Sequence, residues 1–115
     1  MANNNALFIG WNRSNPGREK ASIESFQDFL NYLGKQQSAG MIQSFTPVFL
    51  EVHGGDLNGF VLIQGEPEGL IKLQGDDAFE THLVKGTVTM NGLGVLPAYT
   101  GKQLENRMQK FAKYV

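Results

Sequence analysis

Apolar residues recur with two different periods along this chain, and the two periods divide it into strands and helices. Short, largely apolar stretches, in which successive side chains would fall on alternate faces of an extended chain, predict strands over residues 6–13, 42–53, 60–65 and 92–99. Helical spacing predicts one helix that ends near Gly34 or Gly40, and a second that starts at Pro67 and is interrupted at Gly75. A third, amphipathic helix is predicted over residues 102–115. The predicted order is β-α-β-β-α-β followed by a terminal helix.

Local signals support this division. Asn15 is suited to cap the first helix and Pro16 to its first turn, and Asp76 is suited to cap the resumed second helix. Pro47 in the second strand indicates a bulge or an edge position. The order of elements is the ferredoxin-like α+β arrangement, in which both helices pack on one face of a four-stranded antiparallel sheet. We therefore expect residues 1–115 to form a single ferredoxin-like domain.

The predicted sheet is apolar on both faces. Leu7 and Ile9 would point to one side of the first strand and Phe8 to the other, and the third strand sets Val61 against Leu62 in the same way. One layer of helices covers only one face, so the other face needs a cover. We expect a homodimer in which two sheets pack face to face. The alternative is that the terminal helix folds over the open face within one chain.

Composition limits the classes of function. The 115 residues carry a net charge of −1 and a sequence pI near 6.1, so no electrostatic surface for nucleic acid or anionic membrane is indicated. There is no cysteine, which excludes thiolate metal sites, disulfides and a cysteine nucleophile. The first residues lack the pattern of a secretory signal, and no apolar run approaches the length of a membrane helix. These features favour a cytoplasmic protein.

Glu51 and His53 are the candidate catalytic pair. They are two residues apart in a predicted strand, so their side chains would emerge on the same face. If that face lines a cavity, the carboxylate could orient the imidazole, which would then move a proton near neutral pH. The alternative interpretation is that both residues belong to the turn sequence HGGDLNG and bond to its backbone.

Three further residues are candidates for ligand binding. Trp11 and Tyr99 would form aromatic walls, and Arg18, near the start of the first helix, would bind an anionic group. His82 lies in the second helix near an apolar stripe, where a boundary residue is expected more often than a ligand. Neither histidine is surrounded by carboxylates at metal-ligand spacing, so no metal site and no cofactor are predicted.

The order of elements and three segments carry a resemblance to a known family. PGRE at 16–19, EVHGGDLNGF at 51–60 and NGLGVLPAYTG at 91–101 resemble small, uncharacterised bacterial members of the dimeric α/β-barrel superfamily. That superfamily contains cofactor-independent monooxygenases, haem-degrading enzymes, muconolactone isomerases and YciI-like proteins. The resemblance implies a homodimer with a cavity and does not imply one reaction. The Asn, Trp and His set of the haem-degrading members has no residue-by-residue match here.

Two hypotheses of function follow. In the first, the protein binds a small organic molecule and acts as an enzyme, by proton transfer or by cofactor-free oxygenation, with His53 as the base and Glu51 as its orienting partner. In the second, it is a non-catalytic ligand sensor or a structural dimerisation module. An enclosed cavity with convergent polar groups would favour a binder, whereas His53 in the hairpin and away from any pocket would favour the non-catalytic class.

Overall fold

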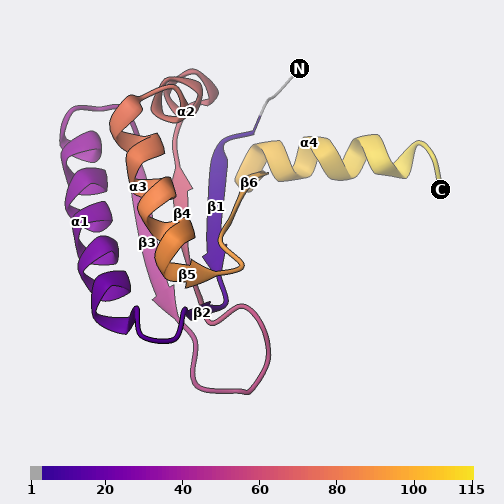
Figure 1. The fold of residues 1–115 in the computed structure, drawn as a ribbon. Coiled ribbons are helices and arrows are strands. Elements are labelled where there is room, and N and C mark those ends of the chain that lie inside the picture. The colour runs from indigo at the N-terminus through magenta and orange to yellow at the C-terminus, as the bar shows by residue number, and fades with distance from the viewer. Residues whose placement is uncertain (1–3) are drawn as a thin grey trace.

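The computed structural model describes residues 4–115 and has the predicted α+β architecture (Figure 1). The main sheet is antiparallel, with the strand order β3-β4-β1-β6. Helices α1 and α3 pack on one face of this sheet, which confirms the ferredoxin-like arrangement. The elements are β1 (Ala6–Trp11), β2 (Arg13–Ser14), α1 (Glu19–Ser38), β3 (Ser44–Phe49), β4 (Gly59–Gln64), α2 (Pro67–Gln74), α3 (Asp77–Thr89), β5 (Met90–Asn91), β6 (Gly94–Ala98) and α4 (Gly101–Ala112).

The helix-facing side of the sheet forms the core. Leu7, Ile9 and Trp11 alternate along β1 toward the helices, as the pattern predicted, and Val61 and Ile63 lie beside them on β4. Residues from the three helices close this core from the other side: Phe29, Leu33, Leu70, Leu73 and Phe79. The apolar residues on the inner face of the strands and those on the inner faces of the helices therefore form one core.

Helix α1 begins later than predicted. It starts at Glu19 with Arg18 as the N-cap residue, and Gly17 before it has a φ of 81°, which interrupts any helix begun at Pro16. Asn15 does not cap the helix: its backbone N–H donates to the Thr89 carbonyl oxygen at 2.8 Å. The helix continues through Gly34 and ends before Gly40.

The second helical region is divided as predicted. Helix α2 ends at Gly75, and Asp76 is the N-cap residue of α3. The Asp76 side chain makes no cap hydrogen bond and instead accepts one from the Tyr32 hydroxyl, at 2.5 Å. Asp76 therefore occupies the N-cap position of α3, but its carboxylate bonds to Tyr32 of α1 and not to the backbone of α3.

The two outer strands of the sheet, β3 and β6, each contain a proline. Pro47 lies in β3, which confirms the predicted edge position, and Pro97 lies in β6 at the opposite edge. The predicted strand 92–99 is shorter in the structure, where β6 spans Gly94–Ala98 and joins the main sheet. The preceding β5 pairs separately with β2.

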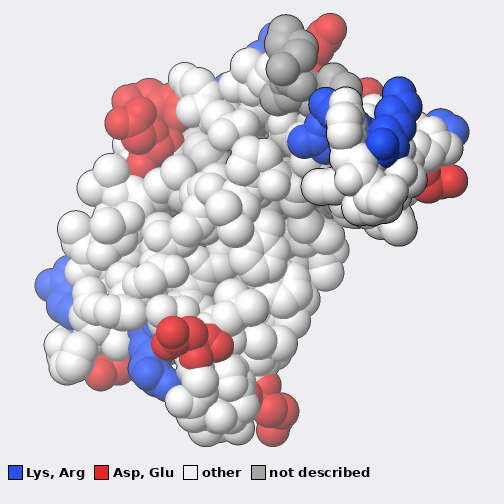
Figure 2. Space-filling view, turned by 90° about the vertical axis from the view of Figure 1, so that its right-hand side faces the viewer, with Lys and Arg blue, Asp and Glu red and all other residues white. Residues whose placement is uncertain are grey.

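The face of the sheet opposite the helices is open. The four main strands contain no charged residue, and Figure 2 shows this face with Lys, Arg, Asp and Glu confined to its rim. Phe8 and Phe60 stack on it with ring centroids 5.0 Å apart, and Leu96 beside them is 59% exposed. Ser44, Thr46 and Gln64 make one corner polar. This face is apolar and uncovered in the single chain.

Helix α4 does not cover the open face of its own chain. It extends away from the sheet, on the side opposite α1 and α3 (Figures 1 and 2), and none of its residues is buried. The arrangement in which the terminal helix covers the sheet within one chain is therefore wrong. The homodimer stays a prediction.

Candidate functional site

Trp11 lies at the end of β1, on the helix side of the sheet. Its ring is buried and packs edge-on against Phe26 of α1 and Phe49 of β3, with centroid distances of 5.2 and 6.2 Å. Gly59, its partner on β4, makes room for the ring, because a Cβ there would lie 2.6 Å from Trp11 Cζ2. Trp11 thus lines an internal space, and its role as a ligand wall stays a prediction.

A small apolar cavity lies beyond Trp11, between β1, α1 and α3. Its volume is about 20 Å³, which is room for about one water molecule. The lining residues are Ile9, Trp11, Ser25, Phe26, Phe29, His82, Leu83, Gly86, Met90 and Leu93. Ser25 and His82 are the polar side chains in this wall.

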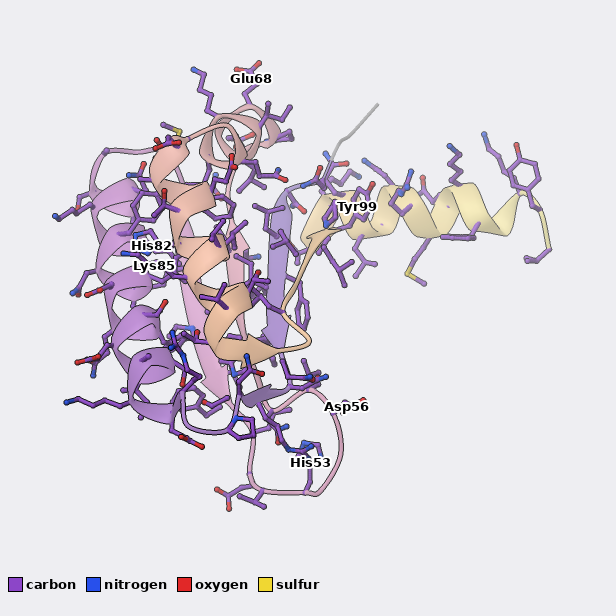
Figure 3. All side chains as sticks on the ribbon, viewed as in Figure 1. His53, Asp56, Glu68, His82, Lys85 and Tyr99 are labelled. Carbon is purple, nitrogen blue, oxygen red and sulfur yellow. The ribbon has the colours of Figure 1, made fainter. Side chains whose placement is uncertain are left out.

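His82 carries a polar atom that has no partner. Its Nδ1 is buried without a hydrogen bond to any described residue. The ring lies between α1 and α3 (Figure 3), 5.0 Å from the Tyr32 ring and 5.6 Å from the Phe29 ring. Burial lowers the pKa of His82, nearby Lys85 lowers it further, and Asp28 opposes the shift. The neutral imidazole is therefore favoured at neutral pH, and it can accept a hydrogen bond or a proton.

A larger, open groove of about 420 Å³ adjoins this cavity. The two spaces share Trp11, Phe26 and Met90 as lining residues. The groove is otherwise lined by Ser14, Ser22, Ile23, Gln27, Leu30 and Phe49. An apolar molecule in the groove would thus contact the side chains that separate it from His82.

His53 and Glu51 lie outside this region. Strand β3 ends at Phe49, so both residues belong to the exposed loop 50–58, and the prediction that they share a strand face is wrong. His53 Nδ1 accepts a hydrogen bond from the Gly55 N–H at 3.2 Å, and Nε2 lies 3.1 Å from the Leu57 carbonyl oxygen. Figure 3 shows His53 far from His82, at the end of the molecule formed by this loop. The alternative interpretation, in which the turn backbone holds His53, describes the contacts correctly.

The loop 50–58 is held by contacts from the end of β1. Asn12 Oδ1 accepts from the Leu57 N–H at 2.8 Å, and Arg13 Nη2 donates to the Gly55 carbonyl oxygen at 3.1 Å. Leu57 has a φ of 59°, which is unusual for a leucine. These tertiary contacts replace the strand pairing that the sequence pattern predicted for residues 50–53.

Tyr99 and Arg18 do not join Trp11. Tyr99 follows β6 at the end of the sheet opposite Trp11, and its ring lies under the Arg107 guanidinium at 4.5 Å from centroid to Cζ. Arg18 is exposed at the start of α1 and lines neither the cavity nor the groove. Within one chain, the predicted aromatic walls and anion clamp therefore lie in three separate places.

Sequence reasoning assigned His82 no part in a site. Phe79, His82 and Gly86 are spaced so that they lie on one side of α3, and this spacing is the sequence signal for a site at His82. Gly86 leaves space there for the Leu93 side chain. A Cβ on Gly86 would lie 2.9 Å from Leu93 Cδ2. That spacing alone does not distinguish a cavity wall from a packed helix face.

Two further classes of feature are absent from the described part of the chain. Across residues 4–115, no three His, Asp or Glu side chains are grouped so that they could hold a metal ion. None of the described helices has the length and apolarity needed to cross a membrane.

Comparison with known proteins shows a similarity at the level of the fold. No family model and no curated protein matches the chain. Among solved structures, it is similar to SnoaB, a cofactor-independent oxygenase from Streptomyces nogalater, with a TM-score of 0.53 and 12% sequence identity. The match covers 86% of this chain and 97% of that one. The chain therefore has a ferredoxin-like α+β fold that it shares with SnoaB, and at this identity the likeness shows the fold alone.

Proposed function

We propose that this protein binds a flat, apolar small molecule that carries one hydroxyl group. The molecule occupies the groove beside Trp11, and its hydroxyl end enters the inner cavity between the side chains that line both spaces. Its hydroxyl donates a hydrogen bond to His82 Nδ1. The observation that carries this proposal is the buried Nδ1 without a partner among the described residues, in an otherwise mainly apolar wall.

The chemistry of His82 fits an acceptor. With the proton on Nε2, Nδ1 of a neutral imidazole accepts a hydrogen bond. Because burial and Lys85 lower the pKa of His82, this neutral form persists at neutral pH. The aromatic rings of Trp11 and Phe26 give the ligand a flat apolar contact surface.

An enzymatic role would use the same position. In that role His82 would accept the hydroxyl proton of a phenolic substrate as the electron-rich ring reacts with dioxygen, because the lowered pKa of His82 disfavours a stable imidazolium–phenolate pair before that step. SnoaB is described as a cofactor-independent oxygenase, which supports including cofactor-free oxygenation in this proposal. In this proposal His82 takes the role of base for which His53 was the sequence-based candidate.

The non-catalytic alternative also has support. His53 lies in the exposed loop, and the inner cavity holds no more than about one water molecule. A ligand sensor needs only the groove and the hydrogen bond, without a second reactive group. Oxygen uptake with a set of dihydroxy and trihydroxy aromatic compounds would separate the two roles, since a sensor would bind them without turnover.

Trp11 allows a direct binding test, because it is the only tryptophan and lines both spaces. 3-Nitrophenol and nitrobenzene differ by one hydroxyl, and nitroaromatic rings quench indole emission. We expect 3-nitrophenol to bind about fivefold more tightly than nitrobenzene, which corresponds to one hydrogen bond of about 1 kcal/mol. The preference should disappear in His82→Phe and persist in His53→Gln. Absence of quenching by both compounds, or a preference that His82→Phe leaves unchanged, would contradict the proposal.

We also propose that the protein is a homodimer, assembled through the open sheet faces. The support is the apolar, uncharged face that carries Phe8, Phe60 and Leu96. A two-fold pairing would bury the same patch on both copies.

A further inference from the structure

Helix α4 carries a bare apolar stripe. Leu104, Met108 and Phe111 are spaced four and three residues apart, so they share one face of the helix, and they are 47%, 63% and 72% exposed. The helix extends beyond the body of the domain (Figure 1). The radius of gyration is 15.3 Å, larger than the value of about 13 Å for a compact chain of this length. Within residues 4–115 nothing covers this stripe.

Hydrogen bonds hold the N-terminal end of α4 at Thr100, its N-cap residue. Asn5 Nδ2 donates to the Thr100 carbonyl oxygen at 3.0 Å, and Asn5 Oδ1 accepts from the Thr100 N–H at 2.9 Å. Gln64 Nε2 donates to Thr100 Oγ1 at 3.0 Å. Nearly two turns into the helix, Arg107 packs over the Tyr99 ring. The direction of α4 is therefore set by side chains of the sheet.

We infer that α4 is an arm that binds the flank of a second copy of this chain. The inference rests on the proposed homodimer. When two sheets pack face to face they lie about 10 Å apart. A helix of this length spans about 18 Å, so an arm that points outward from the open face reaches past the partner's sheet. Its apolar stripe would then lie against the side of the partner domain.

The area needed for a stable dimer supports the arm. Four strands about 4.8 Å apart and about 17 Å long present roughly 300 Å² per copy, so two sheet faces bury only about 600 Å². Stable interfaces bury about 1,200–2,000 Å². Each arm presents a strip about 18 Å by 10 Å and buries a matching area on the partner, so two arms raise the total to about 1,300 Å². By planar footprint the two arms would contribute about as much contact as the two sheet faces, so the arms roughly double the interface.

A second copy fits α4 better than a lipid surface does. The helix is amphipathic and carries Lys102, Arg107 and Lys110 against Glu105, a composition that can also bind anionic membranes. However, α4 points along the outward direction of the open sheet face. If it lay flat on a membrane, the apolar sheet face would still meet water. A second copy covers both surfaces at once.

The test uses sedimentation velocity on the full chain and two matched variants. Met108→Glu/Phe111→Glu places charges in the stripe, and Asn106→Glu/Gln109→Glu places the same charges on the opposite side of α4. All four positions are outside the core of the single chain, so both variants should keep the wild-type circular dichroism spectrum. We expect the stripe variant to raise the dimer dissociation constant at least about 100-fold, since each dimer would bury four unpaired carboxylates. The control variant should change it less than about threefold.

The outcomes separate the arm from the homodimer. A wild-type dimer that the stripe variant dissociates, with the control intact, supports the arm. If the stripe variant dimerises as tightly as wild type, the arm is overturned and the homodimer stands. A wild-type monomer at micromolar concentration overturns both, and binding of that monomer to phosphatidylserine vesicles would identify a lipid surface as the partner of α4. Binding of 3-nitrophenol at the groove is a separate measurement, so the proposed ligand site can fail or stand whatever sedimentation shows about the arm and the homodimer.

Discussion

The Tyr32 hydroxyl of α1 donates a hydrogen bond to Asp76 Oδ2 at the start of α3, across 44 residues of sequence and 2.5 Å of space. The same Tyr32 ring lies 5.0 Å from the His82 ring. Burial and the hydrogen bond to Asp76 both raise the pKa of the Tyr32 phenol, so it stays a protonated donor at neutral pH. This pair therefore fixes the two helices that form the wall of the candidate site.

Tyr32→Phe should lower the free energy of unfolding by about 1–2 kcal/mol, because it leaves the partly buried Asp76 carboxylate without this donor. Urea denaturation followed by circular dichroism measures the change. Tyr114→Phe is the matched control, since Tyr114 is 80% exposed near the C-terminus and should change stability by less than about 0.5 kcal/mol. Equal effects of the two substitutions would show that the hydrogen bond contributes nothing.

His82 should make stability depend on pH. Its pKa in the folded state is below the ordinary value of 6.5, so below pH 6.5 the unfolded chain takes up this proton more readily than the folded chain. The stabilising contribution is complete above pH 6.5, decreases as the pH falls toward the folded-state pKa, and is lost below it. The difference in unfolding free energy between wild type and His82→Gln should follow this course.

His53→Gln provides the comparison for that measurement. This substitution removes the other histidine, which lies in the exposed loop 50–58 and away from α1 and α3, so the pH dependence assigned to His82 between pH 7.5 and 5.5 should persist in it. A wild-type profile that coincides with His82→Gln over this range would show that His82 titrates as it does in an unfolded chain.

Gly59→Ala should disturb Trp11. The added Cβ would lie 2.6 Å from Trp11 Cζ2 and 3.0 Å from the Val48 carbonyl oxygen, so the indole must move. We expect a loss of about 1–3 kcal/mol in unfolding free energy together with a shift of the Trp11 emission maximum. Fluorescence and urea denaturation report the two effects.

Gly34→Ala is the matched substitution in open space. Gly34 lies inside α1, and a Cβ added there would meet no atom within 4 Å outside the backbone of its own helix and its chain neighbours. Alanine there should stabilise the protein by about 0.5–1 kcal/mol and leave the Trp11 emission unchanged. A destabilising Gly34→Ala would mean that α1 is packed differently from the arrangement described.

Leu96→Asp should dissociate the proposed homodimer without unfolding the chain. Leu96 is 59% exposed on the open sheet face, so the single chain tolerates a carboxylate there, whereas a dimer would bury it. Sedimentation velocity measures the change, and Thr87→Asp on the exposed surface of α3 is the control. If Leu96→Asp kept the wild-type dimer, the open face would not be the interface.

The sequence pattern was sufficient for the fold because most of its information is local. The alternation of Leu7, Ile9 and Trp11 predicts a buried strand face, and Gly75 followed by Asp76 predicts the break between α2 and α3. These features depend on residues close in sequence. Strand order then follows from the sequence of elements.

The candidate site could not be predicted in the same way. β3 ends at Phe49 because the residues after it are held by Asn12 and Arg13, which lie about 40 residues away in the sequence. No periodicity reports such contacts, so Glu51 and His53 were placed on a strand that stops before them. His82 becomes distinctive only when α1 packs its aromatic rings around it.

The prolines of the two outer strands have a consequence for how copies of this protein can associate. Pro47 and Pro97 each remove a backbone donor from an exposed border of the sheet. Neither border can therefore recruit a further strand along its full length, which is the route by which sheets grow into fibrils. If copies associate through the apolar sheet face, as proposed, the two prolines oppose further growth through the sheet edges, so the association would end at a closed pair.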